Sequence, residues 1–226
     1  MNARPFMRLL YWTREEFPTF RVDVDVLFGK ELIGRGHQID FVMQADRPDI
    51  PTGAQSWRGR TVYVGRTAAG STLARFAKHW HSFRHDFISL LRLARKDRYD
   101  AIQFRDTFLV ASMGVLVARW RGLRYFYWLS FPYPEADVHH ADAGETRFPR
   151  LARIRGRFSA WLLYRWILPR ADHAFVQSER MKQDLVLEGI PAERMTPVPM
   201  GIAASYIERF PEFAERSDSG ELVLGY

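Results

Sequence analysis

The chain has 226 residues, 47% of them hydrophobic and 26% charged, enough for one globular domain or for one domain and a fragment of another. It contains no cysteine, which excludes disulfides and thiolate metal sites and is typical of a reducing compartment. The start has no long apolar run and no small-residue cleavage site, and no segment approaches the roughly 18 to 20 apolar residues of a spanning helix. We therefore expect a cytoplasmic protein without a signal peptide or transmembrane helix.

The net charge of +7 is concentrated in one segment. The stretch from Arg147 to Arg170 contains seven arginines and no acidic residue. Such an excess is typical of proteins that bind nucleic acid, anionic lipid or an anionic substrate, and it also occurs on an ordinary solvated helix face. No nucleic-acid-binding motif accompanies it, so we expect no nucleic-acid partner. Because Trp161 and Trp166 lie among the arginines, peripheral contact with an anionic membrane surface stays open as an alternative.

Hydrophobic periodicity predicts strands that alternate with helices along the first 170 residues. The predicted strands are 8–12, 38–44, 61–65, 99–104 and 125–129. The predicted helices are an amphipathic segment that ends near Ile33, then 71–96, 108–119 and the basic helix 150–168. A polar loop is expected at 13–21, and an unstructured loop of about twenty residues is expected after position 129.

The stretch from Ala171 to Gly201 predicts one complete crossover unit. Residues 174–177 form a short β-rich run, and Ser178 follows in the position of a helix N-cap. Gly189 ends that helix, and a second short strand at 195–198 runs into Gly201. A strand, a capped helix, a turn and a strand make a parallel βαβ connection.

The repeated alternation predicts an α/β fold, a Rossmann-like doubly wound parallel sheet with helices on both faces. In such sheets ligands bind beyond the carboxyl ends of the strands. Here those ends lead into the segments 13–21, 105–107, 130–145 and 178–179, and Gly201 closes the same edge. We expect these segments to line one cleft.

Three groups of residues resemble the N-terminal domain of family-4-type glycosyltransferases, which have the two-Rossmann-domain GT-B architecture. The first group is Asp172, Ser178, Gly189, Pro191, Pro199 and Gly201. The second is Leu32, Gly36, His37, Ile39 and Phe41, and the third is the strand that begins at Tyr99-Asp100. The sequence departs from the family pattern at Met200, where Asn is commoner, and at Arg21-Val22, where Gly-Gly is frequent. It also lacks a His near Ser130, where many relatives have one that contacts the sugar.

The resemblance implies a transferase that moves a hexose from a nucleotide sugar to a glycan or lipid-linked acceptor, with retention of configuration and without a metal. Residues 1–212 would be the acceptor-side domain, 213–220 a linker and 221–226 the start of a truncated C-terminal domain. In relatives that second domain holds the nucleotide sugar and its diphosphate. We therefore expect no other cofactor, and no transferase activity from this chain alone.

The candidate substrate-binding residues lie on the segments that are expected to line the cleft. They are Arg14, Glu15, Arg21, Arg105, Asp106, Tyr133, Glu135, Asp137, His139, Ser178, Glu179 and Gly201. Arginines suit anionic groups, and carboxylates suit sugar hydroxyls. No catalytic residue can be assigned from the sequence.

Two patterns in the sequence have the spacing of metal sites. Asp23-Val-Asp25 has the DxD spacing, but it opens a predicted helix, where acidic residues favour the helix dipole. His81 and His85 have metal-compatible spacing but no third ligand nearby, so we expect no metal. No GxGxxG follows a strand, which disfavours a dehydrogenase. The alternative to a transferase domain is a non-catalytic Rossmann-like module that docks on a membrane or a partner.

Overall fold

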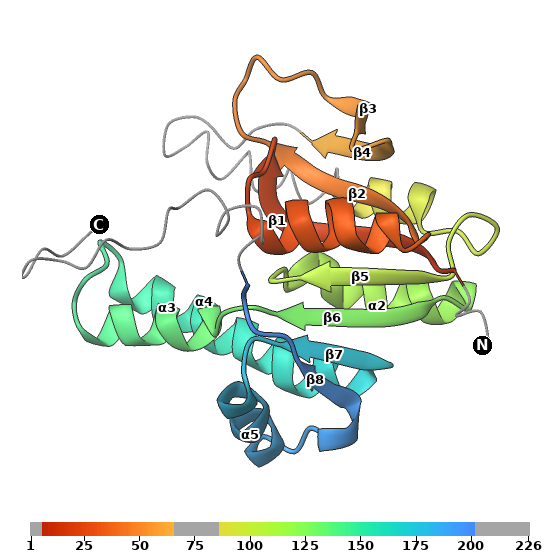
Figure 1. Ribbon diagram of the computed structural model, residues 1–226. Coiled ribbons are helices and arrows are strands. Elements are labelled where there is room, and N and C mark those ends of the chain that lie inside the picture. Colours follow the sequence, from red (N-terminus) through yellow and green to blue (C-terminus); the bar gives the residue numbers. More distant parts are fainter. Residues whose placement is uncertain (1–5, 66–85, 202–226) are drawn as a thin grey trace, which may run out of the picture.

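The computed structural model describes residues 6–65 and 86–201 (Figure 1). In this part of the chain, eight strands form one sheet in the order β3-β4-β2-β1-β5-β6-β7-β8. Neighbouring strands are parallel, except for the antiparallel pair of β3 and β4. The strands are β1 (Arg8–Phe17), β2 (Gln38–Ala45), β3 (Gly53–Trp57), β4 (Arg60–Gly65), β5 (Ala101–Arg105), β6 (Arg124–Leu129), β7 (His173–Val176) and β8 (Met195–Pro197).

Helices cover both faces of this sheet (Figure 1), so the α/β doubly wound fold predicted from the sequence is confirmed. The π-type helix η1 (Asp23–Leu32) packs on one face. The other face is covered by the helical residues 86–93, α2 (Leu109–Arg121), η2 (Leu162–Ile167), which continues α4 (Pro149–Trp161), and α5 (Glu179–Leu187). The remaining helices are α3 (Tyr133–Asp142), against which α4 packs, η3 (Leu168–Arg170) and η4 (Ala192–Arg194). Among the described residues no helix is long and apolar enough to cross a membrane.

The alternation of side chains along β1 builds two cores, one on each face. Leu10 and Trp12 belong to the core under α2, whereas Leu9 and Tyr11 belong to the core under η1. These are the two sides of one strand with a period of two residues. Because both faces are buried, β1 reads as a continuous apolar run, as central strands of parallel sheets do.

The first predicted loop is wrong in its boundaries. The segment 13–17 continues β1 as a strand, after a register shift between Trp12 and Glu16. Glu16 and Phe17 pair with Gln44 and Ala45 of β2, and Phe17 is buried against the ring of Trp57. The polar residues 13–16 therefore form part of a strand, because β1 pairs with the neighbouring strand β2 along this stretch.

The strand β3 was missed by the sequence interpretation. It pairs with β4 through a two-residue turn at Arg58 and Gly59, whose φ angles are 53° and 72°. Positive φ at both central positions is characteristic of a type I′ hairpin, in which glycine is favoured. The expected helix 71–96 falls partly outside the described residues, and its last part, 86–93, is helical.

The long unstructured loop predicted after position 129 is also wrong, because α3 forms there. Pro134 occupies its first turn, where a missing N–H costs no hydrogen bond. The helix is fixed by α4 through Gly156, where an added Cβ would lie 2.8 Å from the Pro134 carbonyl oxygen and 2.8 Å from Val138 Cγ2. This contact is tertiary, so no local pattern in the segment indicates it.

Two aspartates hold the amino ends of the central strands. Asp100 accepts the backbone N–H of Arg8 at 2.9 Å and a guanidinium N–H of the same residue at 2.8 Å. Asp172 accepts the backbone N–H of Tyr125 at 2.7 Å. Each aspartate directly precedes a strand, Asp100 before β5 and Asp172 before β7, and each binds the neighbouring strand. Each carboxylate thus ties the start of its own strand to the start of the next one.

We predict that Asp100→Asn lowers stability at neutral pH and that the loss disappears in acid. Hydrogen bonds from the Arg8 side chain and backbone lower the pKa of Asp100 to about 2, from an ordinary value of about 3.9. A lowered pKa gives stabilisation that is present above the ordinary value and is lost as the pH falls toward 2. Urea unfolding at pH 7, 4 and 2 measures this. A gap between the two proteins that stays constant with pH would contradict it.

Gly114 marks a close approach of α2 to the sheet, and we predict that Gly114→Ala lowers the free energy of unfolding by about 1–3 kcal/mol. An added methyl group would overlap the Phe104 ring, which is fully buried. Gly34→Ala is the matched control, because nothing lies within 4 Å of that position and alanine favours a helix. Equal denaturation midpoints for the two variants would show that the Phe104 ring moves aside freely.

Candidate functional site

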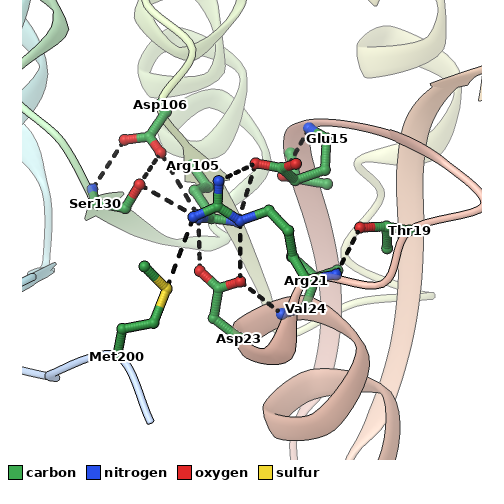
Figure 2. A network of polar contacts seen from close by, with 10 residues as sticks. Glu15, Thr19, Arg21, Asp23, Val24, Arg105, Asp106, Ser130 and Met200 are labelled. Atoms are coloured by element: carbon green, nitrogen blue, oxygen red, sulfur yellow. Dashed lines mark hydrogen bonds and ion pairs between the residues drawn. The ribbon is translucent and has the colours of Figure 1, made fainter. Parts of the chain in front are cut away.

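Polar side chains from separate parts of the chain meet at the carboxyl edge of the sheet, on the face covered by η1. Figure 2 shows them converging from the end of β1, the start of η1, the ends of β5 and β6, and the segment after β8. The parallel strands bring these points together, because their carboxyl ends lie along one edge. This cluster, which we call the edge network, consists of Glu15, Thr19, Arg21, Asp23, Arg105, Asp106, Ser130 and Met200.

Arg105 is the centre of the edge network. It is the last residue of β5, and its side chain is only 1% exposed. Its Nη2 lies 2.6 Å from Asp23 Oδ2 and 3.3 Å from Ser130 Oγ, and its Nη1 lies 3.5 Å from Glu15 Oε1. Burial alone would lower the pKa of Arg105, but Tyr11 and the neighbouring carboxylates raise it above its ordinary value. The guanidinium is therefore a fixed, buried positive charge.

Asp106 joins the ends of β5 and β6. Its φ angle is 51°, in the left-handed region that aspartate tolerates better than most residues. In this conformation its carboxylate accepts the backbone N–H of Ser130 at 2.9 Å and also the hydroxyl of Ser130. Burial raises the pKa of Asp106 in spite of these two donors. The arrangement fixes the end of β6 from which the following segment leaves the sheet.

Arg21 is the cation that the edge network presents to solvent. Its side chain is 36% exposed, with Nη1 3.3 Å from Glu15 Oε1 and Nε 3.4 Å from Asp23 Oδ1. A further guanidinium nitrogen lies 3.8 Å from the thioether sulfur of Met200, in the segment after β8. Both ion pairs are longer than the 2.6 Å pair between Arg105 and Asp23, and the Arg21 side chain is far more exposed than that of Arg105. Arg21 is consequently held near the cleft but keeps hydrogen-bonding capacity.

The edge network has three carboxylates, Glu15, Asp23 and Asp106, and two guanidinium groups, Arg105 and Arg21. Its positive and negative charges nearly balance, with one more carboxylate than guanidinium groups. Glu15 is 22% exposed and Arg21 is 36% exposed, so one acceptor and one donor reach the surface side by side. Such a pair can bind hydroxyl groups, which donate to a carboxylate and accept from a guanidinium.

A pocket of about 230 Å³ lies directly beside the edge network, and its walls are mainly apolar. Its lining residues are Val22, Asp23, Val26, Leu27, Glu31, Trp128, Gln177, Val198, Pro199, Met200 and Gly201. They come from η1, the ends of β6 and β7, and the segment after β8. Trp128 is 3% exposed, and its indole N–H has no hydrogen-bond partner in the described part of the chain. Apolar walls with a few polar groups are typical of small-molecule sites.

Five of the residues proposed from the sequence lie in this region. Glu15, Arg21, Arg105 and Asp106 belong to the edge network, and Gly201 lines the pocket. They come from separate strands, and the sequence placed all of these positions at strand ends.

The other proposed residues are placed differently. The Arg14 guanidinium lies 4.8 Å from the centre of the Tyr133 ring. Glu135 accepts from the hydroxyl of Tyr164 in η2, and Asp137 pairs with Arg155 of α4 at 2.6 Å. His139 is exposed on α3, Ser178 caps α5 by accepting the Met181 N–H at 3.1 Å, and Glu179 is exposed.

Asp23 and Ser130 were missed as site residues. The sequence predicts Asp23 at a helix start, and it does begin η1, but its carboxylate also binds Arg105. Asp25 instead pairs with Arg58 at 2.8 Å, so the two aspartates serve separate ion pairs. Across 6–65 and 86–201, no group of three or more acidic or histidine side chains could hold a metal. His81 and His85 lie outside the described residues.

The profile of the Glycosyl transferase 4-like domain family matches residues 28–201, more than half of the chain. The chain belongs to the Glycosyl transferase 4-like domain family. The edge network and the pocket are thus features of a glycosyltransferase-type domain. Among curated proteins, nothing matches the sequence.

Solved structures show the same fold at low sequence identity. Arabidopsis thaliana UGT89C1 complexed with UDP-L-rhamnose has a TM-score of 0.53 at 10% identity, with 89% of this chain and 54% of that chain covered. LpCGTa in complex with UDP has a TM-score of 0.50 at 12% identity, with 92% and 56% covered. The UDP-N-acetylglucosamine 2-epimerase from Rickettsia bellii has 0.50 at 13% identity, with 87% and 45% covered.

This glycosyltransferase-4-like domain spans about half the length of those solved proteins, 45% to 56% of each. At such low identity the likeness establishes the fold alone. Transferases and an epimerase both have this fold, so the reaction has to be argued from the family and from the site.

Proposed function

We propose that this domain is the acceptor-side half of a glycosyltransferase that moves a hexose from a nucleotide sugar to a glycan or lipid-linked acceptor. The observation that carries the proposal is the apolar pocket at the carboxyl edge, with the edge network along its side. A sugar ring has apolar C–H faces and a rim of hydroxyls. The pocket supplies apolar walls, and Asp23, Glu31 and Gln177 supply polar groups for such a rim.

Arg21 is proposed to meet the anionic part of the reactants. It stands where relatives of this family frequently have glycine, and its guanidinium lies next to the Met200 end of the pocket. A diphosphate leaving group develops negative charge as the sugar departs, and a positioned cation favours that charge. Arg105 is proposed as a positioning residue, because it is buried and acts on the ligand only through Asp23 and Glu15.

We propose from the family resemblance that the reaction retains configuration and does not depend on a metal. The two aspartates of the DxD pattern are committed to arginines on different sides, Asp23 to Arg105 and Asp25 to Arg58. A glycosidase would place two carboxylates on opposite sides of the scissile bond. In the edge network the carboxylates are instead held by Arg105 and Arg21, which favours a binding role for them.

The donor nucleotide sugar is proposed to be held mainly by a second Rossmann-like domain, so the cleft here would hold the acceptor. The test is to incubate this chain with UDP-glucose and GDP-mannose and to measure both turnover and binding of p-nitrophenyl glucoside and mannoside. We expect binding of a hexoside without transfer. Turnover by this chain alone would contradict the proposal that a second domain holds the donor. The absence of hexoside binding would contradict the acceptor site.

A further inference from the structure

A pair of aromatic rings begins the segment that leaves the edge network after β6. Phe131 follows Ser130 directly in the chain, and its side chain is 47% exposed. Its ring meets the half-buried ring of Tyr133 edge to face, with 4.9 Å between the ring centroids and an interplanar angle of 66°. The backbone N–H of Tyr133 donates to the Phe131 carbonyl oxygen at 2.9 Å, so a tight turn fixes the two residues relative to each other.

Arg14, in the last part of β1, covers the same tyrosine. Its guanidinium carbon lies 4.8 Å from the centre of the Tyr133 ring, which is a cation–π contact. Arg14 is exposed, and its side chain has no hydrogen bond or ion pair with another residue of 6–65 or 86–201. Its N–H donors therefore keep their hydrogen-bonding capacity. We call Arg14, Phe131 and Tyr133 the aromatic corner.

The aromatic corner borders the edge network at two points of the chain. Phe131 directly follows Ser130, and Arg14 directly precedes Glu15. The side chains of Ser130 and Glu15 lie 3.3 Å and 3.5 Å from the guanidinium of Arg105. That guanidinium in turn binds a carboxylate of the pocket wall at 2.6 Å. The edge network thus connects the aromatic corner with the pocket.

The open aromatic surface of the corner is the ring of Phe131. Tyr133 is half-buried, with Arg14 over its ring and Phe131 beside it. Phe131 is more exposed and lies just before α3, which begins beyond the carboxyl end of β6 (Figure 1). Its ring therefore lies at the same edge of the sheet as the pocket, and Tyr133 supports it from the side.

The chemistry of the aromatic corner suits a sugar better than a phosphate group. The C–H face of a sugar ring packs on an aromatic face, and its hydroxyl oxygens accept hydrogen bonds from a guanidinium. A phosphate group would use the guanidinium but would gain nothing from an exposed ring. The corner offers both contacts side by side, and exposed apolar groups with polar ones at their rim are typical of binding sites.

We propose that the aromatic corner is a second sugar subsite, so that the favoured acceptor is an oligosaccharide of two or more units. This inference rests on the proposed function, in which the pocket holds one acceptor sugar. The neighbouring unit would stack on Phe131 with its hydroxyls toward Arg14. The pocket, of about 230 Å³, is smaller than the roughly 300–1,000 Å³ of typical ligand sites, so a longer acceptor has to extend over the surface beside it.

The test compares methyl monosaccharides with methyl disaccharides as ligands of the whole chain, by isothermal titration calorimetry. The monosaccharides are methyl glucoside and methyl mannoside, and the disaccharides are methyl maltoside, methyl cellobioside and methyl mannobioside. Methyl glycosides are used because a nitrophenyl group would itself stack on Phe131. At least one disaccharide should bind about tenfold more tightly than its monosaccharide, the effect of one added stacking contact.

Phe131→Ala should remove the disaccharide gain, because it deletes the ring on which the second sugar stacks. Tyr133→Ala should also remove it, whereas Tyr133→Phe keeps the supporting ring and should retain the gain. The matched control is Phe158→Ala, because Phe158 is 50% exposed on α4 and belongs neither to the edge network nor to the pocket. The control should bind every glycoside as the parent protein does, and circular dichroism checks that each variant is folded.

Two results would overturn the second subsite alone. They are equal affinity of the parent protein for monosaccharides and all three disaccharides, and a disaccharide gain that Phe131→Ala leaves intact. Binding of inorganic pyrophosphate that Arg14→Gln abolishes, without a disaccharide gain, would assign the corner to an anion instead. If the parent protein binds none of the glycosides, the acceptor site itself is contradicted, so failure of the proposed function is distinguished from failure of the subsite.

Discussion

Replacing Arg105 by methionine should lower the free energy of unfolding by about 3–5 kcal/mol, the usual cost of removing one partner from a buried ion pair. Methionine fills much of the same space, so the main effect is electrostatic. Asp23, Asp106 and Glu15 would lose the buried charge that lies between them. Denaturation in urea at pH 7 measures the change.

The same variant should recover stability as the pH is lowered. Burial already raises the pKa of Asp106, and Arg105 opposes that shift, so its removal raises the pKa further. A raised carboxyl pKa makes the folded state more stable at low pH, and this advantage is lost as the pH rises. Asp23→Asn in the Arg105→Met background should restore part of the loss, since it removes an unbalanced carboxylate. A loss that is small and independent of pH would contradict the central role of Arg105.

Val26→Trp should abolish most hexoside binding without unfolding the domain. Val26 is a half-buried residue of η1 that lines the pocket, and a larger side chain there would fill part of its roughly 230 Å³. We expect the dissociation constant of p-nitrophenyl glucoside or mannoside to rise at least tenfold, equivalent to about 1.4 kcal/mol. Isothermal titration calorimetry provides the measurement.

The matched control is Val186→Trp, the same substitution at an exposed position of α5 that does not line the pocket. It should leave both the affinity and the melting temperature unchanged. If Val26→Trp binds the hexoside as tightly as the parent protein and the control, the ligand is not in this pocket.

The sequence predicts the fold well because its signals are local and repeated. Strands such as β5 and β6 are short apolar runs. Ser178 marks the start of a helix by capping it, and Gly36 and Gly189 mark helix ends by adopting left-handed backbone conformations. Gly36 and Gly189 do have positive φ angles, 94° and 89°. Such signals depend on a few neighbouring residues and can be recognised without tertiary information.

The errors arise where distant contacts decide the structure. The polar end of β1 is a strand because β2 offers hydrogen bonds beside it, and α3 forms because Gly156 of α4 admits it closely. The site follows the same rule. The expectation that ligands bind at strand ends predicts Arg105 and Asp106 as site residues. Only the packing of η1 brings Asp23 to Arg105. No spacing in the sequence relates Asp23 to Ser130.

The central claim is that the pocket beside the edge network binds the acceptor sugar, and Trp128 provides the most direct test. Its indole N–H lacks a hydrogen-bond partner in the described part of the chain, and Trp128 lines the pocket. The ¹H–¹⁵N signal of this indole, identified by its loss in Trp128→Phe, should shift progressively as p-nitrophenyl glucoside or mannoside is added. An indole signal that stays in place at saturating hexoside would contradict the account.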